Sequence, residues 1–238
     1  MNTKSHKIQR PTLLGIIKAA AIATTVSAHA IDVPIADDAW VGSNTPSYNA
    51  GGDPRLIVSG VAATTRWSYL KFNVASFVPA GTKADDIDKA VIRIYPAVIT
   101  TAGSIAVFNV TGAWLEGKKA NTAASAGELN WTNKPTNEAT QETAFTLATT
   151  DADEFLSLDV TILVKEWLGG PPVTPNFGIL LKPATGSLVN ITFDSKENAT
   201  NAKQPTLDVT LVKKRIRPLG DLSMGTFKSG PTPDGLAP

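Results

Sequence analysis

The chain has 238 residues, of which 42% are hydrophobic and 18% charged, proportions that are typical of a globular protein. It contains no cysteine, which excludes a disulfide framework, a thiolate nucleophile and a cysteine-ligated zinc site. The formal net charge is +1, and the two histidines, His6 and His29, both lie among the first thirty residues. Histidine chemistry therefore depends on whether those residues are retained.

Residues 1–30 have the pattern of an export signal. Basic residues precede a largely apolar run over 13–26, which leads to the small-x-small sequence Ala28-His29-Ala30. Lys18 interrupts the run, which argues against a membrane-spanning helix. We expect the mature protein to begin near Ile31, without histidine and with a net charge of −3, because the removed segment carries four bases and no acid. A secreted, periplasmic or cell-surface protein is expected, and its charge does not favour nucleic-acid binding.

The chain from residue 32 to residue 212 is rich in predicted strands. Short runs with alternating apolar residues are bounded by clusters of Gly, Pro, Asn and Asp, as in antiparallel sheets. Ten strands are expected: 36–42, 55–59, 66–73, 90–99, 104–110, 143–148, 155–159, 176–183, 188–194 and 206–212. We predict an all-β sandwich in a single domain over residues 31–212.

One short helix is predicted within this β-rich region. Apolar residues recur at i, i+3, i+4 and i+7 from Val160 to Trp167, with Asp159 as the N-cap and Gly169, followed by two prolines, at the end. We expect this helix to cap one open edge of the sandwich. Residues 213–238 begin with a basic run and continue with many prolines and glycines, which predicts a flexible tail.

Eight sequence segments between residues 36 and 212 resemble, in the same order, the blocks of one known domain family. The segments are Ala36-Asp37-Asp38-Ala39-Trp40-Val41, Arg66-Trp67-Ser68-Tyr69-Leu70-Lys71-Phe72, Ala90-Val91-Ile92-Arg93-Ile94-Tyr95, Trp114-Leu115-Glu116, Asn130-Trp131-Thr132-Asn133-Lys134-Pro135, Asp159-Val160-Thr161 with Val164-Lys165-Glu166-Trp167-Leu168, Asn176-Phe177-Gly178-Ile179-Leu180-Leu181-Lys182, and Phe193-Asp194-Ser195-Lys196-Glu197 with Lys203-Gln204-Pro205-Thr206-Leu207. Together they resemble the DNRLRE, or disaggregatase-related, domain.

The resemblance implies a jelly-roll-like β-sandwich. Domains of this kind are usually appended to secreted polysaccharide-active or surface proteins, and some members are classed as carbohydrate-binding modules for alginate-like polyuronates. No catalytic domain accompanies the β-rich region in this chain. A binding role would then be carried out by this domain alone.

Catalysis would have to rely on carboxylates. The chain has no Gly-x-Ser-x-Gly elbow, P-loop or Gly-x-Gly-x-x-Gly fingerprint, and a mature chain without histidine cannot form a Ser-His-Asp triad. A glycosidase needs only two suitably spaced carboxylates, which sequence spacing cannot select. The candidates are Asp37, Asp38, Glu116, Glu154, Glu166 and Asp194. Such acids more often lie in turns, cap helices or face solvent than take part in catalysis. We therefore predict that the protein is not an enzyme.

Calcium is the one cofactor that the sequence leaves open. Two acidic clusters, at 85–88 and 151–154, lack the spacing of a twelve-residue calcium loop and are expected to be polar loops. Asp37 or Asp38 could instead join a carboxylate from a distant loop, as in other jelly rolls. No cofactor is required by the pattern.

A candidate binding face follows from strand alternation. If Leu70 and Phe72 face the core, their neighbours on the strand face outward, and the same holds for the residues that alternate with Ile92 and Ile94. The predicted outward-facing ligand-binding residues are Trp67, Tyr69, Lys71, Arg93 and Tyr95. Aromatic rings stack on sugars and basic groups pair with uronates, whereas Trp114, Trp131 and Trp167 are assigned to the core or its rim.

We predict an exported, non-catalytic protein that binds an anionic, alginate-like polysaccharide. The alternative is a structural or adhesive protein of the cell surface or extracellular matrix that packs against other proteins. Exposed aromatic and basic side chains also stabilise sheets without binding anything, and a loop such as 43–52 could cover Trp67. The sequence predicts neither a nucleic-acid partner nor a membrane span.

Overall fold

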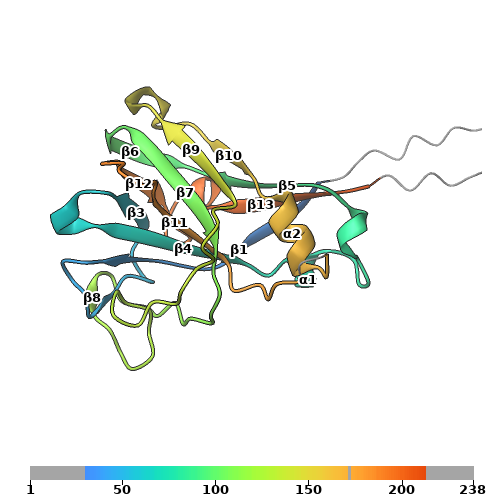
Figure 1. Ribbon diagram of the computed structural model, residues 1–238, viewed down its shortest axis with the longest axis horizontal. Helices are drawn as coiled ribbons and strands as arrows, with labels where there is room; N and C mark the ends of the chain where they lie inside the picture. Colours follow the sequence, from blue (N-terminus) through green and yellow to red (C-terminus); the bar gives the residue numbers. More distant parts are fainter. Residues whose placement is uncertain (1–29, 171–172, 213–238) are drawn as a thin grey trace, which may run out of the picture.

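A computed structural model describes residues 30–170 and 173–212 (Figure 1). Residues 1–29 of the predicted export signal, the two prolines after the helix and the predicted tail lie outside these residues, whereas Ala30 is the first residue of the first strand. Among the helices of the described ranges, none is long and apolar enough to cross a membrane.

The described chain is an all-β sandwich, as predicted (Figure 1). Nine of the ten expected strands are present as single strands, although some have different ends. The strands are β1 (Ala30–Gly42), β2 (Tyr48–Asn49), β3 (Arg55–Ser59), β4 (Arg66–Phe72), β5 (Ile87–Ile94), β6 (Pro96–Thr101), β7 (Gly103–Asn109), β8 (Thr122–Ala123), β9 (Thr143–Leu147), β10 (Leu156–Asp159), β11 (Ile179–Pro183), β12 (Asn190–Asp194) and β13 (Thr206–Leu211).

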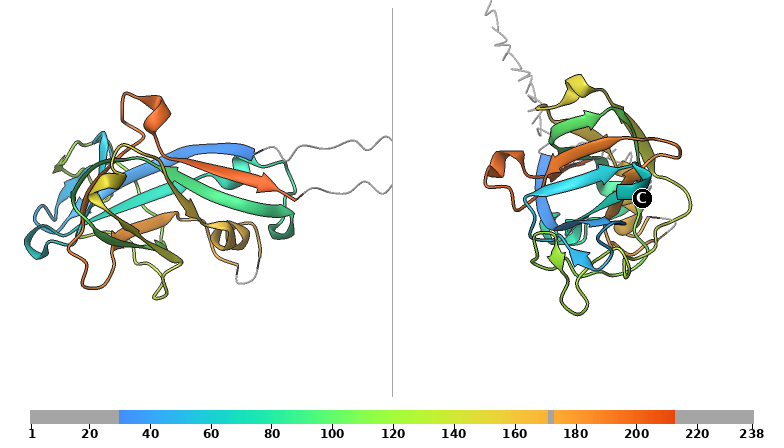
Figure 2. Two further views of the ribbon diagram at one scale, coloured as in Figure 1. Left: turned by 90° about the horizontal axis from the view of Figure 1, so that it is seen from above. Right: turned by 90° about the vertical axis from the view of Figure 1, so that its left-hand side faces the viewer.

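The long strand β1 belongs to both layers of the sandwich. Its first part pairs with β13 and its second part with β4, and the register shifts at a bulge between Ile35 and Asp37. One run of strands is β10-β5-β13-β1 and the other is β1-β4-β11-β7-β9, while β12 pairs with β3 and β6. Figure 2 shows β13 beside β1 and β5. A bulge bends a strand, and this one lets a single strand serve two sheets.

The main core lies between the layers. Alternate residues of most strands enter it, including Leu70 and Phe72 of β4 and Ile92 and Ile94 of β5, and all four are fully buried. The prediction that these four residues face the core is confirmed. Period-two alternation places one whole set of side chains on one face, so the opposite residues of β4 and β5 face outward from the core.

The single strand predicted over 90–99 is wrong, because two strands occupy this region. β5 ends at Ile94 and pairs with β13, whereas β6 begins at Pro96 and pairs with β12. Proline has no N–H for the ladder and is commonly the first residue of a strand. The break therefore falls at Tyr95, between strands with different partners.

The predicted helix is present as α2 (Thr161–Trp167) and packs near β5. The N-cap is Val160 and not the predicted Asp159, whose carboxylate accepts hydrogen bonds from the backbone N–H and the hydroxyl of Thr161, at 3.0 and 2.6 Å. Leu163 and Val164 enter the core, and Trp167 is half-buried against it. The other short helices are α1 (Val74–Phe77), η1 (Ala62–Thr64), η2 (Ala84–Asp86), η3 (Thr149–Asp151) and η4 (Asn201–Lys203).

A second apolar cluster covers the outer face of β1, β4, β11 and β7. The segment 110–142, which links β7 to β9, crosses this face and packs Leu129 on Tyr69 and its neighbours. The indole N–H of Trp114 donates to the carbonyl of Phe177 at 2.8 Å, which ties the segment to the chain just before β11. The outer face is thus partly buried under a long loop.

Candidate ligand-binding site

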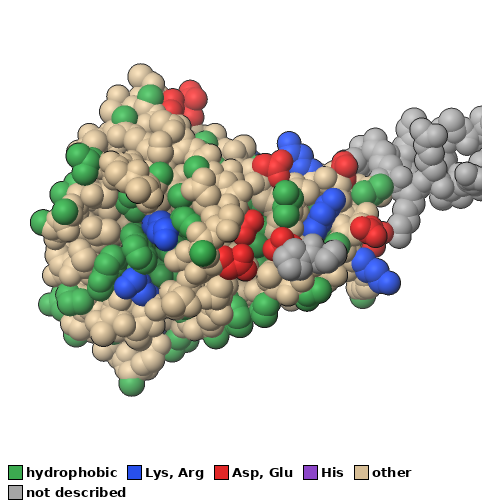
Figure 3. Space-filling model, viewed as in Figure 1, with side chains coloured by type: hydrophobic (Ala, Val, Ile, Leu, Met, Phe, Trp, Pro, Cys, Tyr) green, Lys and Arg blue, Asp and Glu red, His purple; other side chains and the backbone are tan. Residues whose placement is uncertain are grey.

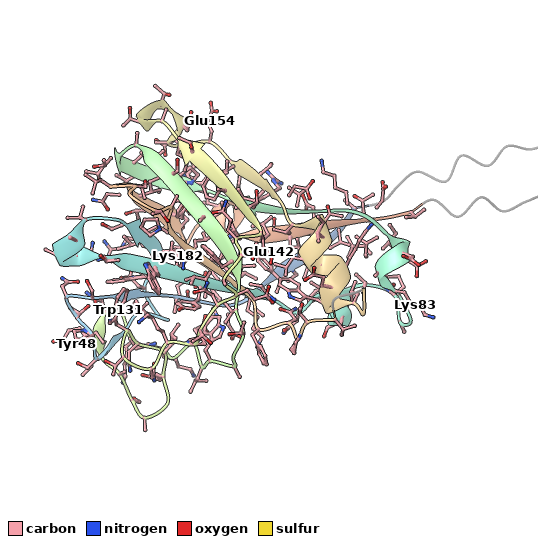
Figure 4. All side chains as sticks on the ribbon, in the orientation of Figure 1. Tyr48, Lys83, Trp131, Glu142, Glu154 and Lys182 are labelled. Carbon is pink, nitrogen blue, oxygen red and sulfur yellow. The ribbon has the colours of Figure 1, made fainter. Side chains whose placement is uncertain are left out.

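Three aromatic rings and two ammonium groups converge at the rim of the second apolar cluster. Trp67 lies on β4, Phe108 on β7 and Lys182 on β11, while Trp131 and Lys134 come from the segment 110–142. We call these five residues the lysine cluster. Figure 4 shows Lys182 and Trp131 on one face of the molecule.

Strand register brings the sheet members of the lysine cluster together. Leu181 pairs with Ser68, so the next residue of β11, Lys182, lies beside Trp67 of β4. Leu180 pairs with Phe108, which makes Phe108 a diagonal neighbour of Lys182. The Lys182 Nζ lies 3.9 Å from the Phe108 ring centroid and 5.3 Å from that of Trp67.

A tight turn supplies the loop members. The Asn130 side-chain oxygen accepts hydrogen bonds from the N–H groups of Thr132 and Asn133, at 2.9 and 3.1 Å, in a turn typical of asparagine. The turn places the Trp131 ring 4.9 Å from that of Trp67, and the Lys134 Nζ 4.0 Å from the Trp131 centroid. Lys134 also donates to the Trp131 carbonyl at 2.8 Å.

The two ammonium groups have no carboxylate partner among the described residues. Neither Lys134 nor Lys182 forms a salt bridge there, and burial lowers the pKa of both lysines from the ordinary value of 10.5. Aromatic faces stabilise a cation but do not neutralise it. Figure 3 shows basic groups around a hydrophobic surface on this face. The arrangement can stack a flat apolar face and pair with an anion.

A cleft continues from the lysine cluster. It has a volume of about 370 Å³ and runs between residues 60–65 and residues 183–188, with Trp67 and Lys182 at one end. Its other lining groups are hydroxyls, backbone and small apolar side chains. Lys182 is the only charged residue among them.

An acidic patch lies on the same face, beyond the lysine cluster. It consists of Glu138, Glu142 and Glu166. Burial, and then the charges of Glu166 and Glu138, raise the pKa of Glu142. Figures 3 and 4 show acidic groups, with Glu142 among them, to the right of Lys182.

The three predicted site residues of β4 have different surroundings. Trp67 belongs to the lysine cluster. Tyr69 is 0% exposed, its ring packs on Trp114 and its hydroxyl donates to the Pro135 carbonyl, because the segment 110–142 covers it. Tyr69 faces away from the main core as predicted, but its predicted accessibility to a ligand is wrong. Lys71 forms an ion pair with its cross-strand neighbour Asp37 at 3.5 Å and lies about 13 Å along the strand from Trp67.

Arg93 and Tyr95 lie elsewhere, so the predicted single platform is wrong. β13 and β1 separate β5 from β4, because β1 passes from one layer to the other. Tyr95 is buried, and its hydroxyl donates to the Asp153 carbonyl and carboxylate at 3.0 and 3.2 Å. Arg93 is exposed and lies over the Phe155 ring. With Lys203, which lies over Tyr95, these residues form what we call the tyrosine cluster: Arg93, Tyr95, Phe155 and Lys203.

Sequence reasoning missed Lys134 and Lys182 and assigned Trp131 to the core or its rim. One signal was available for Lys182, because it alternates with the core residues Ile179 and Leu181 and so faces away from the core. Nothing in the spacing of residues 130–135 indicates that they fold over β4. That placement depends on a contact between segments more than sixty residues apart.

Three carboxylates, of which only that of Asp38 is fully buried, form a separate cluster that joins three parts of the chain. Ligand oxygens of Asp38, Glu116 and Glu197 lie within 4.8 Å of one another, the one such group within residues 30–170 and 173–212. The Lys196 ammonium lies among them, 2.6 Å from Glu116 and 3.0 Å from the Ala36 carbonyl. This ammonium already interacts with carboxylate oxygens that a divalent ion would need as ligands. The present arrangement therefore fits an internal ion pair better than a calcium ion.

Asp38 itself is only 1% exposed and could not reach a substrate. Its carboxylate accepts a hydrogen bond from the Lys196 N–H at 2.8 Å, and its own N–H donates to Glu116 at 2.6 Å. Burial, and then the charge of Glu197, raise the pKa of Asp38 well above 3.8. This cluster pins the segment 110–142 and the loop after β12 to β1.

The two acidic clusters considered for calcium have local roles. Asp86 accepts a hydrogen bond from the Lys83 N–H, and Asp151 accepts one from the Ala148 N–H, at 3.0 and 2.8 Å. Each thereby caps the start of a short helix, η2 or η3. Capping is a common role of aspartate.

A β-sandwich that presents aromatic rings and cations beside an open cleft has the features of a carbohydrate-binding module. The sequence model of carbohydrate-binding module family 96 matches residues 29–210, and the chain belongs to that family. The match names this family and not the DNRLRE domain that the segments resemble. A search of curated proteins found no match.

Proposed function

We propose that this protein is an exported, non-catalytic module that binds a polysaccharide with carboxylated sugars through the lysine cluster. Family membership supports the carbohydrate class. The proposed anionic specificity rests on one observation: the ammonium groups of Lys134 and Lys182 lie over aromatic rings without a carboxylate partner among the described residues.

The physical argument rests on desolvation. An ammonium that is partly buried without a counter-ion has a lowered pKa, as both lysines do, and gains most when an anion arrives. A uronate carboxylate supplies that anion as a charge-assisted hydrogen bond. The partly exposed side chains of Trp67 and Trp131 supply apolar surface for the sugar ring.

The test is migration of the full chain in gels that contain alginate. We expect Trp67→Ala combined with Lys182→Met to abolish retardation, and Lys182→Met alone to weaken it strongly. The matched control is Lys71→Met, which removes a lysine from the same sheet face but one already paired with Asp37. Wild-type retardation should fall as salt rises.

Three results would contradict the proposal: retardation that survives the double substitution, salt-independent binding of neutral glycans only, or self-assembly without glycan binding. The last result would favour the structural or adhesive alternative. Melting temperatures of all variants are measured, because Trp67 also packs on Trp131.

A further inference from the structure

The charge along the binding face is uneven. On one side of the lysine cluster lies the acidic patch Glu138, Glu142 and Glu166, and on the other lies the uncharged cleft. The acidic patch is close: the Asn109 side chain, next to Phe108, donates to Glu138 at 2.9 Å, and the Glu142 N–H donates to the Val107 carbonyl at 2.8 Å. A polyanion anchored at Lys182 is therefore repelled if it continues across β7 toward this patch.

The cleft is built into the fold on the opposite side. Gly60 at the end of β3 donates its N–H to the Val189 carbonyl at 2.8 Å, and a Cβ on Gly60 would lie 1.9 Å from the Ser187 carbonyl oxygen. Only glycine permits this approach of the two walls. The Ser187 hydroxyl accepts a hydrogen bond from the Ser104 N–H at 3.0 Å, so the second wall is also held to the sheet. Pre-formed clefts of this volume are typical of ligand sites.

The lining of the cleft shows what it could hold. Thr65 and Thr185 offer hydroxyls, and Pro183, Ala184 and Leu188 offer apolar contact, with Leu188 66% exposed. No carboxylate lines the cleft, and no cation except Lys182 at its end. A sugar ring, with hydroxyls at its edges and apolar C–H faces, matches this surface without an ionic contact.

We infer that the cleft is a second, uncharged subsite of the proposed glycan site, and that the bound chain runs from the lysine cluster into the cleft and away from the acidic patch. This inference rests on the proposed function. The ligand is a glycan of at least two units, with a carboxylated sugar at Lys134 and Lys182 and its neighbour held by hydroxyl and apolar contacts. The acidic patch sets the direction by excluding the other path.

The direction in which the bound glycan runs is best tested by a variant that gains affinity, because a misfolded protein would not bind more tightly. Thr185 is exposed in the turn between β11 and β12, and Thr136 is exposed beside the acidic patch. Thr185→Lys should tighten binding of an oligogalacturonate about two- to fivefold, through a new surface pair with the second carboxylate. Binding of monomeric galacturonate should not change. Thr185→Gln, which lengthens the side chain without adding a charge, should not tighten binding of either ligand, and Thr136→Lys should leave both affinities unchanged.

Calorimetry on the full chain measures both ligands. A gain of oligogalacturonate affinity with Thr136→Lys, or no gain with Thr185→Lys, overturns the inference. The proposed function still stands in that case if the wild-type protein binds the ligands. If wild type binds neither monomer nor oligomer, the proposed function fails and the inference fails with it.

Discussion

The lysine cluster and the tyrosine cluster contain the same residue types but differ in their neighbours. Both place cations over aromatic rings on the outer face of the sandwich. In the tyrosine cluster, the Tyr95 hydroxyl and the charges of Asp194 and Asp153 raise the pKa of Lys203. In the lysine cluster, burial without a carboxylate lowers the pKa of Lys134 and Lys182.

The two directions of pKa shift have opposite consequences. Lys203 already has anionic neighbours, so an added anion must compete with them. Lys134 and Lys182 have none among the described residues, and this difference is the reason that we propose the lysine cluster, and not the tyrosine cluster, as the anion site.

The largest expected effect comes from reversing one charge in each cluster. Lys182→Glu should weaken oligogalacturonate binding about 10- to 100-fold, because a charged hydrogen bond is lost and a repulsion is created. Lys203→Glu should change the affinity by less than about twofold. Calorimetry on both variants, with melting curves as the control for folding, makes the comparison. Similar losses of oligogalacturonate affinity in the two variants would show that the two clusters do not differ in anion binding.

A smaller effect is expected from pH. An ammonium binds an anion only while protonated, and its lowered pKa means that Lys134 and Lys182 lose their protons below pH 10.5. Affinity for oligogalacturonate should therefore fall as pH rises toward 10.5, whereas Lys203, with its raised pKa, stays charged. Dissociation constants measured from neutral to alkaline pH test this. An affinity that stays flat up to pH 10.5 would contradict the assignment.

The smallest expected effect is a gain at the tyrosine cluster. Asp153 has a positive φ of 64°, which asparagine tolerates, and its side chain accepts from Tyr95. Asp153→Asn should keep this hydrogen bond but remove one negative charge near Lys203. In the Lys182→Glu background we expect oligogalacturonate binding to recover about twofold. If oligogalacturonate binding does not recover, nearby carboxylates are not the reason that the two clusters differ in anion binding.

Much of the fold could be predicted from the sequence. The alternation in β4 and β5 correctly placed Leu70, Phe72, Ile92 and Ile94 in the core, and the i, i+3, i+4, i+7 spacing correctly predicted α2. These patterns are local, since a period of two or 3.6 residues sets which face is apolar. The strand break at Tyr95 was not predicted, because it depends on the different partners of β5 and β6.

The candidate site could be predicted only in part. Trp67 was selected correctly for the outer face of β4, but Tyr69 on the same face is core, because the segment 110–142 folds over it. A shared binding face for Arg93, Tyr95 and Trp67 required their strands to be close, but β13 and β1 lie between β5 and β4. Periodicity tells which side of its own strand a residue occupies and nothing about the strands next to it.

The sequence by itself determined the all-β class, the inward and outward sets of β4 and β5, and the presence of one short helix. It could do so because these depend on hydrophobic burial at fixed local spacings. Only the tertiary structure decided that Trp67, Phe108, Trp131, Lys134 and Lys182 meet and that the acidic patch bounds them on one side. Those contacts join segments far apart along the chain, and their selection comes from strand pairing and from the packing of the segment 110–142 on the sheet.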